Sequence, residues 1–336
     1  MKNAKRNTII LFIVIAIVLY FVMKDDFNEI VDNLILANKW LILFTVVLMI
    51  IYWGLRALSL YLIVRKYKKK IKFSKLFNQT LITQFFNGVT PFATGGEPMQ
   101  VYMLTKSGVK FANATNIIVQ EFIMYQIALV IMGILALGLN FAFDVCVLNP
   151  VLENLIILGF VINILIGLFL LFVSFSKSFS RFVVKVGLKI GNKFKFIKNK
   201  EEAREEWNER LKEYHESGEM LKKNKLLFFV CVVLNFVALL LFYIIPYFIF
   251  ISLGYDIGFM QVLVSSAFIL LIGNFVPIPG GSGGIEFGFL EFFKPFCPVG
   301  PLKSALIIWR SVTYFLGIII GGCALGFFKG DEKKCE

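Results

Sequence analysis

The chain has 336 residues, of which 58% are hydrophobic and 38 are Phe, and it carries a formal net charge of +13. A soluble protein of this length keeps more polar surface and fewer long apolar runs, so the composition excludes a soluble enzyme and indicates an integral membrane protein. Most of the Lys and Arg residues lie in short segments between apolar runs. This distribution favours contact with an anionic membrane surface and argues against nucleic acid as a partner.

The residue types that carry enzyme or metal chemistry are few and scattered. The one histidine, His215, lies in a Glu-rich polar stretch, and no two cysteines form a CxxC pair. We therefore expect no disulfide framework, no metal site, no cofactor and no catalytic residue. The five cysteines are Cys146, Cys231, Cys297, Cys323 and Cys335.

Six apolar segments are long enough to cross a bilayer as helices, which takes roughly 20 residues. A basic N-terminus precedes the first segment, but no small-residue cleavage site follows Met23. We expect this segment to be a retained helix and not a cleaved signal peptide. The six predicted spans are 8–23, 40–64, 112–140, 151–174, 226–251 and 304–327.

Basic residues indicate which loops face the cytoplasm. The loop 65–75 is rich in Lys, the connection 24–39 is acidic, and Lys residues follow the last span. We therefore predict a multi-pass cell-membrane protein with both termini in the cytoplasm. The loop 141–150 is then outside and the polar stretch 175–225 inside.

Two further apolar regions, 76–104 and 260–293, are interrupted by Pro and Gly and do not match ordinary spans. Lys106 and Lys110 follow the first region, which we expect to enter from the cytoplasm and return there. The second region should begin and end outside, because the last span has to bring the chain back to the cytoplasm. Two opposed re-entrant hairpins between full spans form an inverted repeat, as in many transporters. We predict an all-α polytopic membrane protein, with a single domain over residues 1–336.

The two hairpins have similar motifs at their breaks. The first reads Asn87-Gly88-Val89-Thr90-Pro91 and then Gly95-Gly96-Glu97; the second reads Asn274-Phe275-Val276-Pro277 and then Gly283-Gly284-Ile285-Glu286. Pro interrupts a helix, Gly permits a tight reversal, and a helix that restarts after Gly-Gly presents unpaired N–H groups with a partial positive charge. Such a helix end suits an anion such as a phosphate. The alternative is a purely structural turn or hinge.

Charged residues within the apolar regions complete the predicted site. Arg310 is the best candidate to meet a lipid phosphate or to pair with Glu286. Glu97 and Glu286 either cap the restarting helices, contact a cationic head group or carry a proton. For Arg56 and Glu121 we expect snorkelling to the inner interface. The candidate binding residues are Pro91, Gly95, Gly96, Glu97, Asn274, Pro279, Gly280, Gly281, Ser282, Gly283, Gly284, Glu286 and Arg310.

The polar stretch 175–225 has two halves. In the first, basic residues recur every four positions from Lys177 to Lys193, interleaved with apolar ones, which predicts an amphipathic helix lying on anionic lipid. The second half, 201–219, mixes acidic and basic residues and predicts a solvated helix with i,i+4 pairs. The alternatives for the stretch are a passive surface helix or a docking surface for a lipid synthase.

These motifs resemble those of the lysylphosphatidylglycerol synthase/flippase family, of the multiple peptide resistance factor type. The resemblance is carried by Pro91 to Glu97, Pro279 to Glu286 and Arg310, and it covers about residues 5–328. It implies movement of an aminoacylated or otherwise modified lipid from the inner to the outer leaflet, which lowers surface negative charge and favours resistance to cationic peptides. Full-length members add a cytosolic domain that transfers an aminoacyl group from tRNA to phosphatidylglycerol. Here only eight residues follow Phe328, so we expect no aminoacyl transfer by this chain alone.

Three functional hypotheses follow from the sequence and the resemblance. The first is a lipid flippase-like transporter, with a phospholipid as substrate and the phosphate held by helix ends and Arg310. The second is an enzyme, a phosphatidylglycerol lysyltransferase or a membrane helper for one. The third is a carrier of a polyprenyl-linked sugar. A separate lipid synthase and a second copy of the chain are candidate partners, and the sequence leaves the lipid, the direction and the energy source open.

Overall fold

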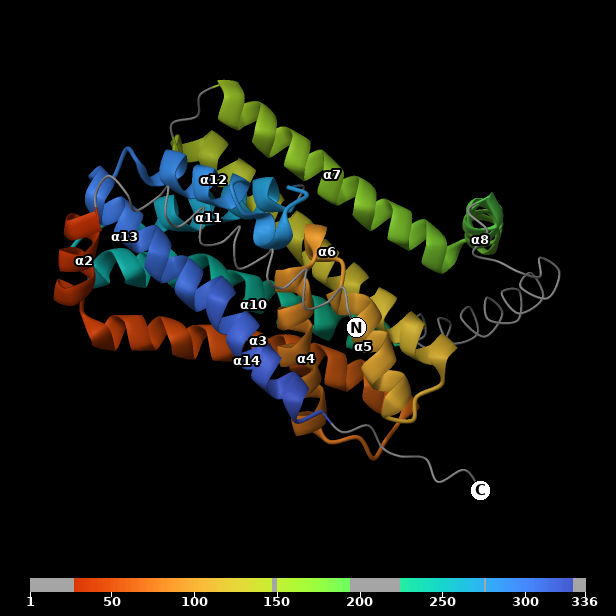
Figure 1. Cartoon of the computed structure of the whole chain (residues 1–336). Coiled ribbons are helices and arrows are strands. Elements are labelled where there is room, and N and C mark those ends of the chain that lie inside the picture. Colours follow the sequence, from red (N-terminus) through yellow and green to blue (C-terminus); the bar gives the residue numbers. More distant parts are fainter. Residues whose placement is uncertain (1–26, 147–149, 194–223, 275, 329–336) are drawn as a thin grey trace.

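The computed structural model of the chain describes residues 27–146, 150–193, 224–274 and 276–328 (Figure 1). All regular elements among these residues are helices, and five helices are long and apolar enough to cross a membrane. The predicted all-α polytopic fold is therefore confirmed. The predicted first span, 8–23, lies outside the described residues.

The long helices match the remaining predicted spans to within a few residues. The largest difference is in the last span, which begins five residues earlier than predicted, after Pro298, and passes through a π-helical turn, η3 (Ser311–Phe315). The five spans are α3 (Lys39–Tyr67), α6 (Phe111–Phe143), α7 (Pro150–Phe175), α10 (Lys225–Ser252) and the continuous pair α13 (Val299–Arg310) and α14 (Leu316–Gly326).

A short helix precedes the first described span. α2 (Phe27–Leu36) packs against α13, in a segment that the sequence had indicated only as an acidic connection. Asn38 follows it and caps α3, because its side-chain oxygen accepts hydrogen bonds from the backbone N–H groups of Trp40 (3.0 Å) and Leu41 (3.4 Å). The cap sets where the first described span starts.

Both interrupted regions are helical hairpins broken at a short 3₁₀ turn. The first consists of α4 (Phe73–Val89), η1 (Pro91–Ala93) and α5 (Gly96–Lys106). The second consists of α11 (Phe259–Gly273), η2 (Pro279–Gly281) and α12 (Gly284–Phe293).

The two hairpins enter the bundle from opposite ends (Figure 1). At one end Lys68, just after α3, donates a hydrogen bond to the backbone oxygen of Ser107, just after α5. At the other end the backbone N–H of Asn38 donates to the oxygen of Ser252 (2.8 Å), shortly before α11 begins. The turns η1 and η2 contact each other in between. The predicted opposed hairpins therefore meet inside the protein.

The turns share one backbone conformation. In each, an extended residue precedes a proline, and the two residues after the proline have positive φ: 53° and 54° at Phe92 and Ala93, 65° and 63° at Gly280 and Gly281. Pro91 therefore corresponds to Pro279 and not to Pro277. The first turn adopts this conformation at Phe92 and Ala93, which carry side chains. The second adopts it at two glycines.

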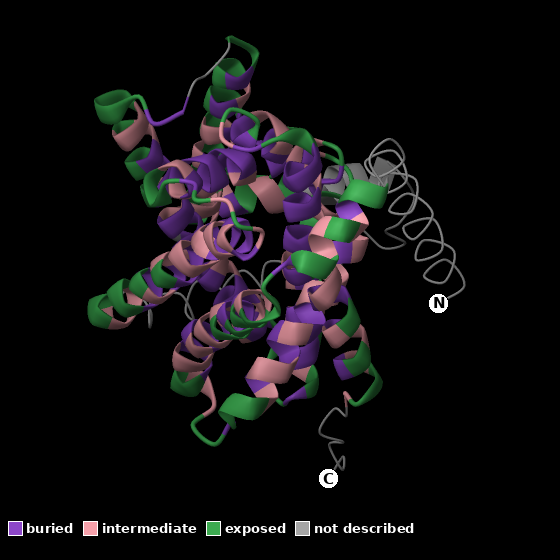
Figure 2. Cartoon of the chain, turned by 90° about the vertical axis from the view of Figure 1, so that its left-hand side faces the viewer, coloured by how far each residue is buried: buried purple, intermediate pink, exposed green. Residues whose placement is uncertain are grey.

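Aromatic packing fixes the second hairpin against the spans. Phe289 of α12 stacks on Trp309 of α13 with ring centroids 4.9 Å apart, and Phe293 lies 4.9 Å from Phe250 of α10. Buried residues gather in the centre of the bundle, whereas the outer faces are exposed (Figure 2). On α7 these exposed side chains are large and apolar, as a lipid-facing surface requires.

The helix α8 (Lys177–Lys193) covers the first half of the predicted amphipathic stretch. Phe179 packs against Phe169 and Phe172 at the end of α7, with ring centroids 5.7 and 5.8 Å apart, whereas Phe182 is 60% exposed. The second half of the stretch, 194–223, lies outside the described residues. Contact of α8 with anionic lipid stays a prediction.

The first hairpin packs closely on the last span, which gives a test of this interface. A Cβ atom at Gly321 of α14 would lie 2.3 Å from the backbone oxygen of Leu81, whereas one at Gly326 would meet nothing within 4 Å. We expect Gly321→Ala to lower the free energy of unfolding by about 1–3 kcal/mol, as overpacking does, and Gly326→Ala to leave it unchanged. Thermal unfolding of both variants in detergent measures this, and equal stabilities would contradict the close packing.

The positive φ angles at the turns give a second test. Ala93→Gly removes left-handed strain, and after the larger unfolded-state entropy of Gly is subtracted we expect a gain of about 0.5 kcal/mol. Gly281→Ala adds that strain and places a Cβ atom 3.0 Å from the backbone oxygen of Gly273, so we expect a loss of about 1–2 kcal/mol. Chemical unfolding in mixed micelles compares the two. Shifts of the same sign would show that the turns do not share this conformation.

Candidate functional site

Arg310 lies in the middle of the last span. It is the eleventh residue after Val299, so at 1.5 Å per residue it is about 16 Å from the start of α13, close to the centre of a hydrocarbon layer about 30 Å thick. The π-helical turn η3 follows it directly. Single π-helical turns within α-helices are often found at functional sites.

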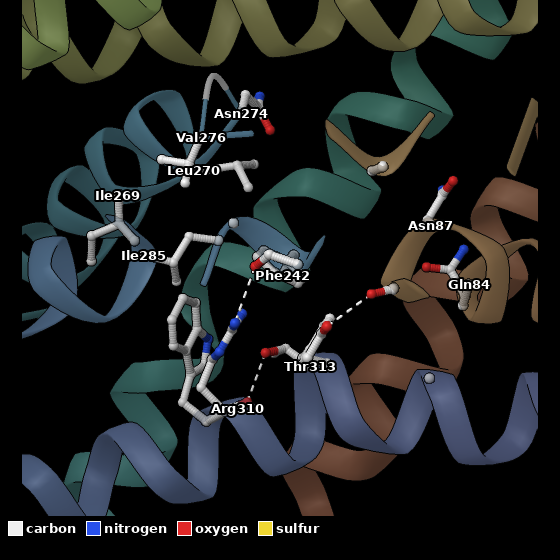
Figure 3. A pocket seen from close by; sticks show the side chains of 18 of the residues that line it. Gln84, Asn87, Phe242, Ile269, Leu270, Asn274, Val276, Ile285, Arg310 and Thr313 are labelled. Carbon is white, nitrogen blue, oxygen red and sulfur yellow. Dashed lines mark hydrogen bonds between the residues drawn. The ribbon is translucent and has the colours of Figure 1, made fainter. Parts of the chain in front are cut away.

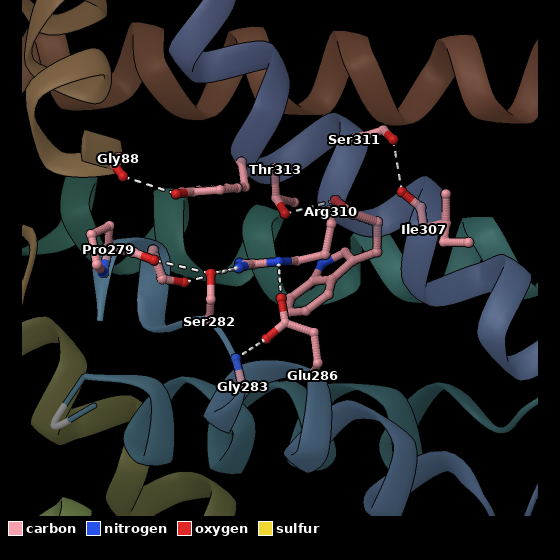
Figure 4. A network of polar contacts seen from close by, with 12 residues as sticks. Gly88, Pro279, Ser282, Gly283, Glu286, Ile307, Arg310, Ser311 and Thr313 are labelled. Carbon is pink, nitrogen blue, oxygen red and sulfur yellow. Dashed lines mark hydrogen bonds and ion pairs between the residues drawn. The ribbon is translucent and has the colours of Figure 1, made fainter. Parts of the chain in front are cut away.

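The Arg310 guanidinium is held by the second hairpin turn (Figure 4). Its Nε forms an ion pair with Oε1 of Glu286 at 2.7 Å, and its Nη2 donates to the oxygen of Gly280 (3.0 Å) and to Oγ of Ser282 (3.2 Å). The other carboxylate oxygen of Glu286 accepts from the N–H of Gly283 at 2.6 Å. Glu286 thus caps α12 and pairs with Arg310 at once, two of the roles considered from the sequence.

Tyr314 connects this turn to the first hairpin. The guanidinium of Arg310 lies 4.4 Å from the centre of the Tyr314 ring, and the Tyr314 hydroxyl donates to the oxygen of Gly88 at 2.8 Å. Gly280 lies directly against the ring, because a Cβ atom there would be 2.2 Å from it. The last span therefore contacts both hairpins through neighbouring turns of one helix.

A cavity of about 220 Å³ lies between the two turns and the last span (Figure 3). Its polar lining comes from both hairpins and from the last span. Its apolar lining includes the Phe92 ring of η1. The polar side chains are Gln84, Asn87, Asn274, Arg310, Thr313 and Tyr314, and the apolar ones include Phe92, Phe242, Ile269, Leu270 and Trp309.

The structure separates the candidate binding residues by what they contact. Arg310, Asn274, Gly280 and Gly281 line the cavity. Three further candidates, at the second turn and the start of α12, bind Arg310 or position Glu286. Five others form the turns or pack within a hairpin. The supporting residues are Ser282, Gly283 and Glu286; the structural ones are Pro91, Pro279, Gly95, Gly96 and Gly284.

Glu97 and Glu286 do not occupy equivalent positions in their helices. It is the second residue of α5, whereas Glu286 is the third residue of α12. One residue of helix turns a side chain by about 100°, so the two carboxylates point to different faces of equivalent helices. Glu97 lies within electrostatic range of Arg56 and Glu121 and not in the cavity lining.

The snorkelling interpretation of Arg56 and Glu121 was wrong. Nη2 of Arg56 and Oε2 of Glu121 lie 3.3 Å apart, Glu121 is only 5% exposed, and the guanidinium lies 4.0 Å from the centre of the Tyr125 ring. Arg56 is eleven residues from the end of α3 at Tyr67, and Glu121 ten from the start of α6 at Phe111. At about 15 Å from the helix ends, the two opposite charges pair with each other more readily than either side chain reaches the interface. The distance of each residue from the end of its apolar segment could have been counted in the sequence.

An amide network extends from the cavity to α7. Nε2 of Gln126 donates to the oxygen (2.8 Å) and to Oδ1 (2.9 Å) of Asn163, and Nδ2 of Asn274 donates to the same Oδ1 at 3.4 Å. Asn163 is buried although its helix faces outward. We had not singled out Gln126 or Asn163, although an amide within a long apolar run is itself a signal.

The site offers an anion a guanidinium and side-chain amides. The unpaired N–H groups expected at the second turn are in part occupied, because Gly281 donates to the oxygen of Ile278, Ser282 to that of Pro279 and Gly283 to Glu286. No group of three or more His, Cys, Asp or Glu side chains with metal-binding geometry is found among the described residues. Because Glu286 already neutralises Arg310, an incoming anion has to replace that carboxylate or share the guanidinium with it.

Comparison with known proteins agrees with the sequence motifs. A family model described as the lysylphosphatidylglycerol synthase TM region matches residues 8–321. A UPF0104 membrane protein of Archaeoglobus fulgidus is 25% identical over 319 residues, 91% of this chain and 92% of its own. Another, of Methanothermobacter thermautotrophicus, is 26% identical over 317 residues, 91% of each chain. A third, of Pyrococcus horikoshii, is 26% identical over 265 residues, 75% of this chain and 76% of its own.

The family model extends from the first predicted span into the last, and so includes both hairpins and Arg310. The resemblance inferred from the motifs is confirmed, and the chain belongs to the family of the lysylphosphatidylglycerol synthase transmembrane region.

Proposed function

We propose that the protein moves an aminoacylated or similarly modified phospholipid between the leaflets of the membrane. The observation that carries this proposal is a buried arginine, Arg310, lining a cavity between two hairpins that enter from opposite ends. Many transporters place their substrate near the midplane between inverted repeats with broken helices. The family assignment supports a membrane role of this kind.

The size of the cavity supports a head group as the part that is bound. At about 220 Å³ it is smaller than the roughly 300–1,000 Å³ typical of sites that enclose a whole drug-sized ligand. A phosphate with its substituent fits this scale better than a complete phospholipid. The acyl chains then stay in the bilayer, where their burial costs nothing.

The charges of the site support a head group that carries both signs. A guanidinium binds phosphate oxygens in pairs, and such charge-assisted hydrogen bonds are about twice as strong as neutral ones. Displacement of Glu286 by a phosphate leaves that carboxylate without a partner. An ammonium group on the same lipid, as in an aminoacyl ester, supplies one. One phosphate and one ammonium then form an ion pair each with Arg310 and Glu286, so neither side chain is left unpaired inside the membrane.

The π-helical turn of the last span supports a moving rather than a static site. One hydrogen bond, from Tyr314 to the oxygen of Gly88, connects the last span to the first hairpin beside the cavity. A π-helical turn, which shifts the register of a helix, carries that tyrosine. Breaking this bond and closing the opposite side of the cavity would expose the head group to alternate leaflets.

The proposal is tested with purified protein in liposomes that contain lysylphosphatidylglycerol in both leaflets. A membrane-impermeant amine reagent reaches only the outer leaflet, so movement of the lipid raises the share of amine that reacts. We expect the wild type to allow nearly complete reaction, and Arg310→Gln to slow it about tenfold or more, because losing charge-assisted bonds costs about 1.5–3 kcal/mol. Arg310→Lys keeps the charge without the paired donors and should be intermediate.

Arg65→Gln is the matched control for Arg310→Gln. Arg65 also lies over a tyrosine ring, that of Tyr61 at 5.5 Å, but at the exposed end of α3. We expect this variant to behave as the wild type. Equal rates for the wild type and Arg310→Gln would contradict the proposal, and new lipid species in cells that express the protein would favour synthesis instead.

A double-mutant cycle separates the structural role of the ion pair from its role in transport. Glu286→Gln alone leaves the Arg310 charge buried and unpaired, so we expect a loss of about 3–5 kcal/mol of stability. Glu286→Gln combined with Arg310→Met should lose clearly less than the sum of the single changes. Thermal unfolding in detergent measures the cycle, with Glu291→Gln on the same helix as a control. Additive losses would mean that the two side chains do not interact.

A further inference from the structure

A second charged cluster lies in the first half of the repeat and takes no part in the head-group site. It consists of Arg56 on α3, Glu97 on α5 and Glu121 on α6. Arg56 and Glu121 form an ion pair at 3.3 Å. α5 packs against α6, and Glu97, nine residues before the end of α5 at Lys106, lies at about the same depth as Glu121, ten residues after the start of α6 at Phe111. Arg56 and Glu121 are near mid-membrane depth, as Arg310 is in the other half.

Two atoms of this cluster are buried without a partner. Oε1 of Glu121 and Nη1 of Arg56 have almost no exposed surface and make no hydrogen bond to any described residue. Glu121 is 5% exposed, so water does not satisfy its second oxygen from bulk solvent. A carboxylate oxygen left bare inside a membrane protein is costly, and it points to a ligand that the cluster binds in some state.

The charges of the cluster do not balance. Two carboxylates share one guanidinium, and none of the three forms an ion pair with any other described Lys, Arg, Asp or Glu. The other titratable groups that face them are uncharged at neutral pH. They are Tyr52 on α3, Tyr125 on α6 and Cys231 on α10. With both carboxylates ionised, the cluster holds one surplus negative charge in a low-dielectric interior.

We propose that Glu97 and Glu121 together bind one proton, and that this proton is exchanged when the lipid moves. Proton binding converts one carboxylate to a carboxyl group and leaves the other to pair with Arg56, so the cluster becomes neutral. No covalent bond of the lipid is made or broken, and water supplies and receives the proton. The coupling to lipid movement rests on the function proposed above.

The position of Glu97 connects this cluster to the cavity. Glu97 is half-buried and follows the turn η1 by a few residues, and the turn residues Phe92 and Ala93 line the cavity. A negative Glu97 draws α5 toward Arg56, whereas a neutral Glu97 does not. A change of charge at one end of this segment therefore acts on the turn that meets η2 and closes one side of the head-group cavity.

The charge count makes a sharp prediction for single variants. Glu97→Gln or Glu121→Gln leaves one carboxylate for one guanidinium, so either change alone should remove the need for a proton. The double variant leaves Arg56 unpaired and should fold less stably than either single one. Glu291→Gln, a half-buried carboxyl on α12, is the control that keeps the cluster intact.

The first measurement is infrared spectroscopy of the purified protein during a pH titration. We expect the wild type and Glu291→Gln to keep a protonated carboxyl band near neutral pH, where ordinary carboxyls are ionised, and to lose it as pH rises further. The band should be missing near neutral pH from Glu97→Gln and Glu121→Gln. The second is the liposome assay with and without a pH difference across the membrane. We expect the difference to change the wild-type rate several-fold and to leave the rates of both cluster variants unchanged.

The two measurements separate failure of this inference from failure of the proposed function. A wild-type rate that ignores the pH difference overturns proton coupling, even while lipid movement itself is observed. Absence of any lipid movement overturns the proposed function and the coupling, and the infrared band then decides on proton binding alone. A carboxyl band unchanged by both single variants overturns the proton site.

Discussion

A backbone inside the hydrocarbon core has no water to bind, so each break in a membrane helix must be covered by protein. Two such breaks meet here, because η1 and η2 contact each other and the last span packs against both hairpins. Neither turn is tolerable alone at this depth. The arrangement of the spans, the close approach of α14 to α4 through Gly321, and the cavity between the turns all follow from the need to enclose these two breaks together.

Enclosing the breaks also creates the chemistry of the site. A turn that reverses inside the membrane exposes carbonyl and N–H groups, and Arg310 satisfies the oxygen of Gly280 while Glu286 satisfies the N–H of Gly283. The same guanidinium and carboxylate then neutralise each other at 2.7 Å. The side chains that line or support the candidate site therefore also support the turn, so a change at either one alters the stability of the protein as well as the site.

Hydropathy, Pro and Gly positions, and the distribution of Lys predicted the described spans and both opposed hairpins, because these features act over a whole segment. They also indicated the pairing of Arg310 with Glu286. The orientation of single side chains was less accessible. Glu97 resembles Glu286 in its motif, but it lies one position earlier in its helix and does not line the cavity. The roles of Asn163 and Gln126 depend on how α7 packs against α6 and α11, which no local pattern encodes.

The one-residue difference between Glu97 and Glu286 has a consequence for symmetry. Two copies of an inverted unit with equivalent carboxylates would present the same surface to each leaflet. Such a protein would be equivalent in either membrane orientation. Here one half has a single pair, Arg310 with Glu286, whereas the other has Arg56 together with two carboxylates. The two halves of the molecule are therefore distinguished by the charges in its core.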